Sequence, residues 1–237
     1  MSIHGFRGPG MSRTAFEMKH ALQRVPHACP TCTFVDGGVR DHIDALFYER
    51  ATDVATRKTI RSARGFCRYH ARLVSNHADA LGTALILQDV LINDLRDMQN
   101  GMYDHPPIKL GRVARFFDSK GGLPLRSPCP LCVVEQDVEA LATDSLLEGL
   151  SDDEFSTLFR QSDGICIPHF RLAFERCRDQ RSWTIILETE QASMGRITHE
   201  LEELARKYDY RSHDKPQGDE ARAWRRALDL TSKDINE

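Results

Sequence analysis

The chain reads C-P-T-C at residues 29–32 and G-F-C-R-Y-H at residues 65–70, and it repeats this order as C-P-L-C at 129–132 and G-I-C-I-P-H at 164–169. The two C-x2-C pairs are 100 residues apart, and the two C-x2-H pairs are 99 residues apart. So constant an offset indicates an internal duplication in which each copy carries three cysteines and one histidine. This duplication decides both the expected fold and the expected chemistry.

Three thiolates and one imidazole form a closed tetrahedral set of the kind that structural zinc sites use, with no position left for a substrate water. In each copy, the C-x2-C pair and the C-x2-H pair that follows it would complete one such set. We therefore predict two zinc ions, each bound within one copy. The expected ligands are Cys29, Cys32, Cys67 and His70 in the first copy, and Cys129, Cys132, Cys166 and His169 in the second.

Two other uses of these cysteines need to be considered. Redox dithiol centres also contain C-P-x-C, but they follow a strand of a βαβ unit, and neither pair here has a strand pattern before it. Three cysteines and a histidine can also hold an iron–sulfur cluster, although the third closely spaced cysteine of ferredoxins is absent from the spacing. Two iron–sulfur clusters would make an electron-transfer protein that serves a redox partner, which is the alternative to zinc. The sequence identifies no catalytic residue and no flavin or nicotinamide fingerprint.

Apolar residues recur at helical spacing along most of the chain, which predicts an all-α fold. Long helices are expected over residues 81–98 and 183–208, and a capping box at 151–154 is expected to open another. The least polar run, residues 80–87, is far shorter than the roughly 20 residues that span a bilayer, and we expect it to be a core segment. The segments between ligand pairs are also expected to be helical, so that each repeat is a helical hairpin held by a metal ion.

The predicted architecture is an internally duplicated helical bundle with two Cys3His metal-clasped halves. Residues 1–118 would form the first metal-binding half, residues 119–213 the second, and residues 214–237 a polar C-terminal tail. The break between the halves is expected near Asp104-His105-Pro106-Pro107, because two consecutive prolines end a helix. One half alone has few apolar residues for a core, so we expect the two halves to form one body.

The composition is that of an ordinary globular protein, with 28% charged and 41% hydrophobic residues among 237. Seven cysteines, an odd number, fit metal binding better than a disulfide framework. The N-terminus has no uninterrupted apolar stretch, which predicts a cytoplasmic protein. Cys177, outside the repeat, is expected to be a buried inert thiol, and His27 a surface histidine.

The sequence gives weaker indications about partners. A net charge of −3 provides no general attraction to nucleic acid, which makes nucleic acid a minor candidate. Acidic residues interleave with the basic residues near the C-terminus, which favours a solvated helix face over a binding patch. We expect an unidentified protein partner, no membrane, and a non-enzymatic scaffold or protein-interaction module, with self-association left open. The basic residues near the C-terminus, which would be the contact for an acidic partner or nucleic acid, are Arg211, Lys215, Arg222, Arg225 and Arg226.

These motifs in combination resemble an uncharacterised bacterial and archaeal family of about this length. Beside the duplicated C-P-x-C and G-x-C-x-x-H motifs, the resemblance includes L-G-T-A-L at residues 81–85 and K-Y-D-Y-R at 207–211, followed by Asp214, Pro216 and Gly218. It extends from about residue 29 to residue 228. Thr31, Thr33 and Ile165 depart from the pattern without removing a ligand. The resemblance implies a duplicated Cys/His protein and no particular activity.

Overall fold

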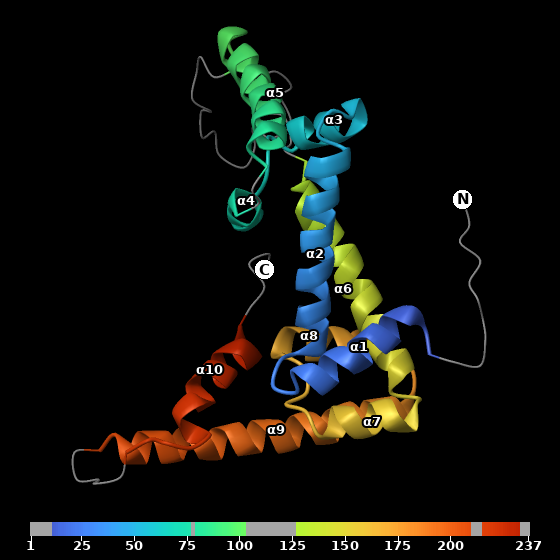
Figure 1. The fold of residues 1–237 in the computed structure, drawn as a ribbon, viewed down its shortest axis with the longest axis vertical. Helices are drawn as coiled ribbons and strands as arrows, with labels where there is room; N and C mark the ends of the chain where they lie inside the picture. Colours follow the sequence, from blue (N-terminus) through green and yellow to red (C-terminus); the bar gives the residue numbers. More distant parts are fainter. Residues whose placement is uncertain (1–10, 77–78, 103–126, 210–214, 233–237) are drawn as a thin grey trace, which may run out of the picture. The chain divides into compact units, whose positions relative to one another are not determined.

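The structure is a computed structural model, and it describes residues 11–76, 79–102, 127–209 and 215–232. In these ranges it contains ten helices and no strand, which confirms the all-α prediction. None of these helices is long and apolar enough to cross a membrane. Their bounds are α1 Arg13–Arg24, α2 Pro30–Glu49, α3 Val54–Ser62, α4 Arg68–Ser75, α5 Ala80–Gln99, α6 Pro130–Gly149, α7 Asp153–Arg160, α8 Ile167–Arg176, α9 Gln180–Lys207 and α10 Glu220–Thr231 (Figure 1).

The chain divides into two compact units, and both α2 and α6 have one part in each unit. Unit 1 comprises residues 1–38 and 137–237, and unit 2 comprises residues 39–136. The boundary predicted between residues 118 and 119 lies outside the described residues. The division into sequential halves therefore stays a prediction.

Unit 1 is organised around α9, the longest helix of the described chain. Helices α7 and α10 both pack against α9, and α1 packs against α7 (Figure 1). Large apolar side chains from α1, α6, α7 and α9 are fully buried in this unit. Their burial stabilises each by roughly 1.5–3 kcal/mol relative to exposure, which makes this the core of unit 1. They include Met18, Leu146, Phe155, Phe159 and Ile186.

Unit 2 has a smaller core in which α3 packs against α5. Ile60 of α3 and Ile86 of α5 are each 1% exposed. Ion pairs border this contact, with Arg61 Nη1 2.8 Å from an Asp89 carboxylate oxygen and Arg64 Nη2 2.8 Å from an Asp97 oxygen. These pairs hold one face of α5 against α3 and the turn that follows α3.

The expectation that residues 80–87 are a core segment is wrong for one face of α5. Gly82 and Ile86 are buried, but Leu81 is 71% exposed and Leu87 is 39% exposed. The reason is that α3 covers only one side of the helix. The other side of α5 has no covering element within the described residues.

The helix predicted from the capping box at residues 151–154 is α7, but its cap lies one residue later. Asp152 is the N-cap, and its Oδ1 accepts a hydrogen bond of 2.8 Å from the Phe155 N–H. Asp at an N-cap satisfies one of the free N–H groups of the first turn as well as Ser does. Ser151 lies outside the helix.

Candidate metal centres

The eight predicted ligands form two groups, and each group combines pairs from both sequence copies. Within each group, one ligand atom per residue lies within 4.8 Å of all the others. Each group lies within one unit. Site 1, in unit 1, consists of Cys29, Cys32, Cys166 and His169, and site 2, in unit 2, consists of Cys67, His70, Cys129 and Cys132.

The prediction that each copy supplies a complete ligand set is therefore wrong. That prediction needed two helices of similar length between the ligand pairs, so that the second helix returns the chain to its start. Instead, α2 has 20 residues and α3 has nine, while α6 has 20 and α7 has eight. A 20-residue helix is about 30 Å long, and a helix of eight or nine residues recovers less than half of that distance. The C-x2-H pair of each copy thus meets the C-x2-C pair of the other.

All four ligand pairs occupy the same position at a helix N-terminus. The first ligand directly precedes α2, α4, α6 or α8, and the second ligand is the third residue of that helix. Pro30 and Pro130 stand at the first helical position, where the fixed φ of proline favours a helix start. Both sites thus lie at helix N-termini, whose partial positive charge stabilises thiolates. Each C-x2-C pair therefore forms the start of a helix, α2 or α6.

The ligand atoms of site 1 are arranged like the corners of one tetrahedron. The Sγ atoms of Cys32 and Cys166 are 3.6 Å apart. Nδ1 of His169 lies 3.5 Å from Cys29 Sγ, 3.3 Å from Cys32 Sγ and 3.0 Å from Cys166 Sγ. A single tetrahedral zinc ion would set about 3.8 Å between two sulfurs and about 3.6 Å between sulfur and nitrogen. The observed distances are slightly shorter than these values, so one ion fits if the side chains move apart by a few tenths of an ångström.

Site 2 has the same arrangement. Cys67 Sγ and Cys132 Sγ are 3.7 Å apart. Nδ1 of His70 lies 3.2 Å from Cys67 Sγ, 3.4 Å from Cys132 Sγ and 3.8 Å from Cys129 Sγ. The His70 ring is fully buried and Cys129 is 9% exposed. Site 2 can therefore hold one tetrahedral ion in a largely enclosed environment.

The closely spaced cysteine sulfurs of site 1 favour the binding of a cation. Burial disfavours ionisation of Cys29, but hydrogen bonds with Cys166, Cys32 and His169 hold the pKa of its thiol well below the usual value. Contacts with the Cys166 and Cys29 sulfurs raise the pKa of Cys32. Burial opposes a charge on His169, but hydrogen bonds to Cys166, Cys29 and Glu139 raise its pKa to about 12. Close thiolates thus need a positive charge beside them, and a divalent cation would supply it.

At site 2 the pKa of the histidine shifts in the opposite direction. Burial lowers the pKa of His70. Burial and the neighbouring Cys129 raise the pKa of the Cys132 thiol to about 12. A neutral imidazole is the form that binds metal, so burial prepares His70 to act as a ligand.

The second ring nitrogen of each histidine faces a glutamate of α6. Nε2 of His169 lies 3.0 Å from Glu139 Oε1, and Nε2 of His70 lies 3.6 Å from Glu135 Oε2. Metal-bound histidines commonly donate the other ring N–H to a carboxylate, which orients the ring and makes it a stronger ligand. Glu139 makes this hydrogen bond, whereas Glu135 lies beyond hydrogen-bond distance. Neither glutamate was predicted from the sequence, although Glu135 and Glu139 follow Cys132 at helical intervals of three and seven.

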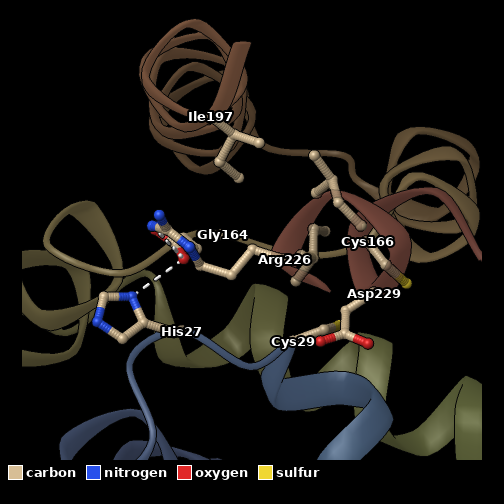
Figure 2. Close-up of a pocket in the computed structure, with 10 residues that line it drawn as sticks. His27, Cys29, Gly164, Cys166, Ile197, Arg226 and Asp229 are labelled. Carbon is tan, nitrogen blue, oxygen red and sulfur yellow. Dashed lines mark hydrogen bonds and ion pairs between the residues drawn. The ribbon is translucent and has the colours of Figure 1, made fainter. Parts of the chain in front are cut away.

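A small pocket in unit 1 adjoins site 1 on the side of α10. His27, Cys29, Gly164, Cys166 and Arg226 are among its lining residues (Figure 2). His27 is not a ligand, since its Nδ1 lies 3.0 Å from an oxygen of the buried Asp163. The prediction of a surface histidine agrees with its 66% exposed side chain.

A buried carboxyl group supports the loop that leads into α8. Glu190 of α9 is 1% exposed, and its Oε1 accepts a hydrogen bond of 2.6 Å from the Ile165 N–H. Burial raises the pKa of Glu190 to about 8. Gly164 has a φ of +78°, and a Cβ at this position would lie 2.1 Å from Glu190 Oε1. The close packing of Glu190 therefore requires glycine immediately before Ile165 and Cys166.

Two further expectations concern Cys177 and the basic tail. Cys177 follows α8 and is partly exposed rather than buried, with its Sγ 3.2 Å from the Asp179 carbonyl oxygen. Of the basic residues, Arg226 is largely buried and pairs with Glu200 of α9, so it fastens α10 in unit 1. Arg225 lies over the Trp224 ring at 5.0 Å, and Arg211 falls outside the described residues.

Comparison with known proteins places the chain in a family but adds no activity. The chain is 25% identical over 206 residues to an uncharacterized 23.9 kDa protein in the xynA 3' region of Caldicellulosiruptor sp. (strain Rt8B.4), covering 86% of this chain and 94% of that protein. No solved structure gives a significant match. Residues 15–237 match the model of a family of unknown function, DUF6062, and the chain belongs to that family.

Proposed function

We propose that this protein is a non-enzymatic helical scaffold held together by two zinc ions, and that it acts in the cytoplasm by binding another protein. The observation that carries the proposal is the tetrahedral arrangement of two Cys3His sets, with every ligand at a helix N-terminus. A closed set of four protein ligands leaves no coordination position for a substrate. This favours a structural role for the metal.

The distances also favour one ion over an iron–sulfur cluster at each site. A cluster distributes its protein ligands over separate iron atoms, so the ligand atoms lie farther apart than in a site for one ion. Both sites keep all four ligand atoms within 4.8 Å of one another. An electron-transfer function with two clusters is therefore the less favoured candidate.

The two ions would contribute substantially to folding, because each joins helices from different parts of the sequence. Structural zinc provides on the order of 10–16 kcal/mol of apparent binding free energy in small peptides, which is comparable to the whole stability of a typical domain. Site 1 joins α2 to α8, and site 2 joins α4 to α6. Removal of zinc is expected to loosen both units.

Metal analysis of protein purified without oxygen tests the proposal. We expect two zinc ions per chain, a colourless sample, and loss of helical circular dichroism when a strong chelator removes the zinc. Cys32→Ser and Cys132→Ser should each leave one zinc per chain. Cys177→Ser is the matched control and should keep two. Iron and sulfide in stoichiometric amounts, with visible absorption, would establish clusters in place of zinc.

A further inference from the structure

Helix α5 presents an apolar face that no other element covers within the described residues. Leu81 is 71% exposed and Leu91 is 66% exposed. An exposed apolar patch larger than a few hundred Å² is typical of an interaction site. The large apolar side chains exposed on α5 and the turn that ends it are Leu81, Leu87, Leu91, Ile92, Leu95, Met98 and Met102.

The spacing of this face is that of a coiled coil. Six exposed residues follow one another at alternating intervals of three and four, which is the repeat of the a and d positions of a heptad. They are Leu81, Ala84, Gln88, Leu91, Leu95 and Met98. The buried positions Gly82, Ile86 and Val90 lie on the other side of the helix. One side of α5 therefore packs within unit 2, and the other has the pattern that fits a second helix.

We propose that α5 pairs with α5 of a second copy of this chain, in an antiparallel arrangement. In this arrangement Leu81 lies opposite Met98 of the other copy, and Ala84 lies opposite Leu95. A small residue thus faces a large one, which fills the seam evenly. The contact is isologous, because each copy offers the same surface to the other.

The residues beside the seam favour a second copy over a different chain. Coiled coils select unlike partners through charged residues at the e and g positions that flank the seam. On α5 these positions hold mainly uncharged residues, namely Leu85, Leu87, Ile92 and Gln99. Asp94 is the exception, and its carboxylate pairs with Arg64 of the same unit. Two identical copies therefore meet without repulsion between like charges.

The size of the face also suits a dimer. Seven partly exposed leucine, isoleucine and methionine side chains provide on the order of 500 Å² per copy, and two copies would bury about 1,000 Å², which is about the smallest area expected of a biological interface. Helix α5 has 20 residues, which gives about three heptads of contact. The proposed dimer is therefore a modest interface whose stability depends on Leu91, which faces Gln88 of the other copy at its centre.

Light scattering and sedimentation of the full-length chain with its metal test the proposal. We expect a dimer for the wild type and a dissociation constant at least about tenfold higher for Leu91→Glu. Leu141→Glu is the matched control, since Leu141 is 51% exposed on α6 and lies outside the seam. Circular dichroism and metal content should be the same in all three proteins. A dimer that Leu91→Glu leaves intact would refute pairing through α5. A monomeric wild type would also refute it, and that is the result expected if residues 103–126 of the same chain cover this face.

A charge exchange tests the antiparallel arrangement. Leu81→Lys and Met98→Glu should each weaken the dimer, because each places a charge in an apolar seam. The double variant should recover at least part of the lost affinity, since each new lysine would face a new glutamate of the other copy. In a parallel pair, lysine would face lysine and glutamate would face glutamate. A double variant weaker than both single variants would therefore disprove the antiparallel arrangement.

Discussion

The sulfur of Cys32 lies 3.3 Å from Nδ1 of His169, a residue 137 positions farther along the chain. The second site likewise combines residues from different copies of the motif, with Cys132 Sγ 3.4 Å from His70 Nδ1. Each candidate centre thus takes one residue pair from each copy of the duplicated motif. A single copy contains the right residue types but does not assemble a site from them.

Paired substitutions test the exchanged arrangement. Cys32→Ser with Cys166→Ser changes two ligands of site 1, so one of the two expected zinc ions should remain. Cys32→Ser with Cys67→Ser changes one ligand in each site, so both ions should be lost or bound far more weakly. Zinc measured per chain after dialysis distinguishes the two double variants. The opposite result would restore the pairing within each copy.

The sequence predicted the residues of both groups but not how they combine. Cysteine spacing and an offset of about 100 residues identify Cys29, Cys32, Cys67 and His70 as a set that recurs. Either C-x2-C pair can complete a tetrahedron with either C-x2-H pair, because the two copies offer the same atoms. The choice depends on the lengths of α2 and α3, and the end of α2 near Arg50 follows from the cap at Asp53. Apolar periodicity alone does not locate such an interruption.

The helices were also easier to predict than the sides that they bury. The apolar residues between 81 and 98 correctly indicate a helix, which is α5. Apolar side chains occur on both sides of this helix, with Ile86 buried and Leu91 exposed. The periods of a core-facing stripe and of a coiled-coil seam differ by only about a tenth of a residue per turn. A helix of 20 residues is therefore too short for the sequence to distinguish the two patterns. Tertiary packing decides which side is covered.

Glu139 and Glu135 offer a matched test of the hydrogen bonds behind the histidines. Glu139→Gln weakens the acceptor that orients His169, and we expect the affinity of site 1 for zinc to fall by roughly 10–100-fold. Glu135→Gln should have a smaller effect on site 2, because Glu135 lies 3.6 Å from His70 Nε2. Competition with a chromophoric chelator measures both affinities. Equal losses in the two variants would show that the shorter contact has no special role.

Gly164 and Gly65 form a second matched pair. Both have positive φ, +78° and +92°, so alanine at either position costs about 1–2 kcal/mol of backbone strain. A Cβ at Gly65 meets nothing within 4 Å, whereas one at Gly164 would lie 2.1 Å from Glu190 Oε1. Gly164→Ala should therefore lower the free energy of unfolding by clearly more than Gly65→Ala and should weaken site 1. Urea unfolding with excess zinc measures the difference. Similar losses would mean that Glu190 moves aside without cost.

The buried carboxyl group of Glu190 predicts a pH dependence of stability. Its pKa is about 8 in the folded protein, against 4.5 for an unperturbed glutamate. The folded state therefore keeps the proton to a higher pH, and the stability that this group contributes is complete below pH 4.5 and is lost as the pH rises through about 8.

Glu190→Gln isolates this effect, because glutamine stays neutral and can still accept the hydrogen bond from the Ile165 N–H. Between pH 6 and pH 8, the free energy of unfolding of the variant should gain about 2 kcal/mol relative to the wild type, since each pH unit well below the pKa is worth about 1.4 kcal/mol and the dependence becomes weaker near pH 8. Urea titrations with saturating zinc at both pH values measure this change, and excess zinc keeps the metal sites filled in both proteins. Glu188→Gln, an exposed substitution on the same helix, controls for the loss of one charge. If the difference between Glu190→Gln and the wild type does not change with pH, the Glu190 carboxyl group is already ionised at pH 6 in the folded protein and its pKa is not raised by burial.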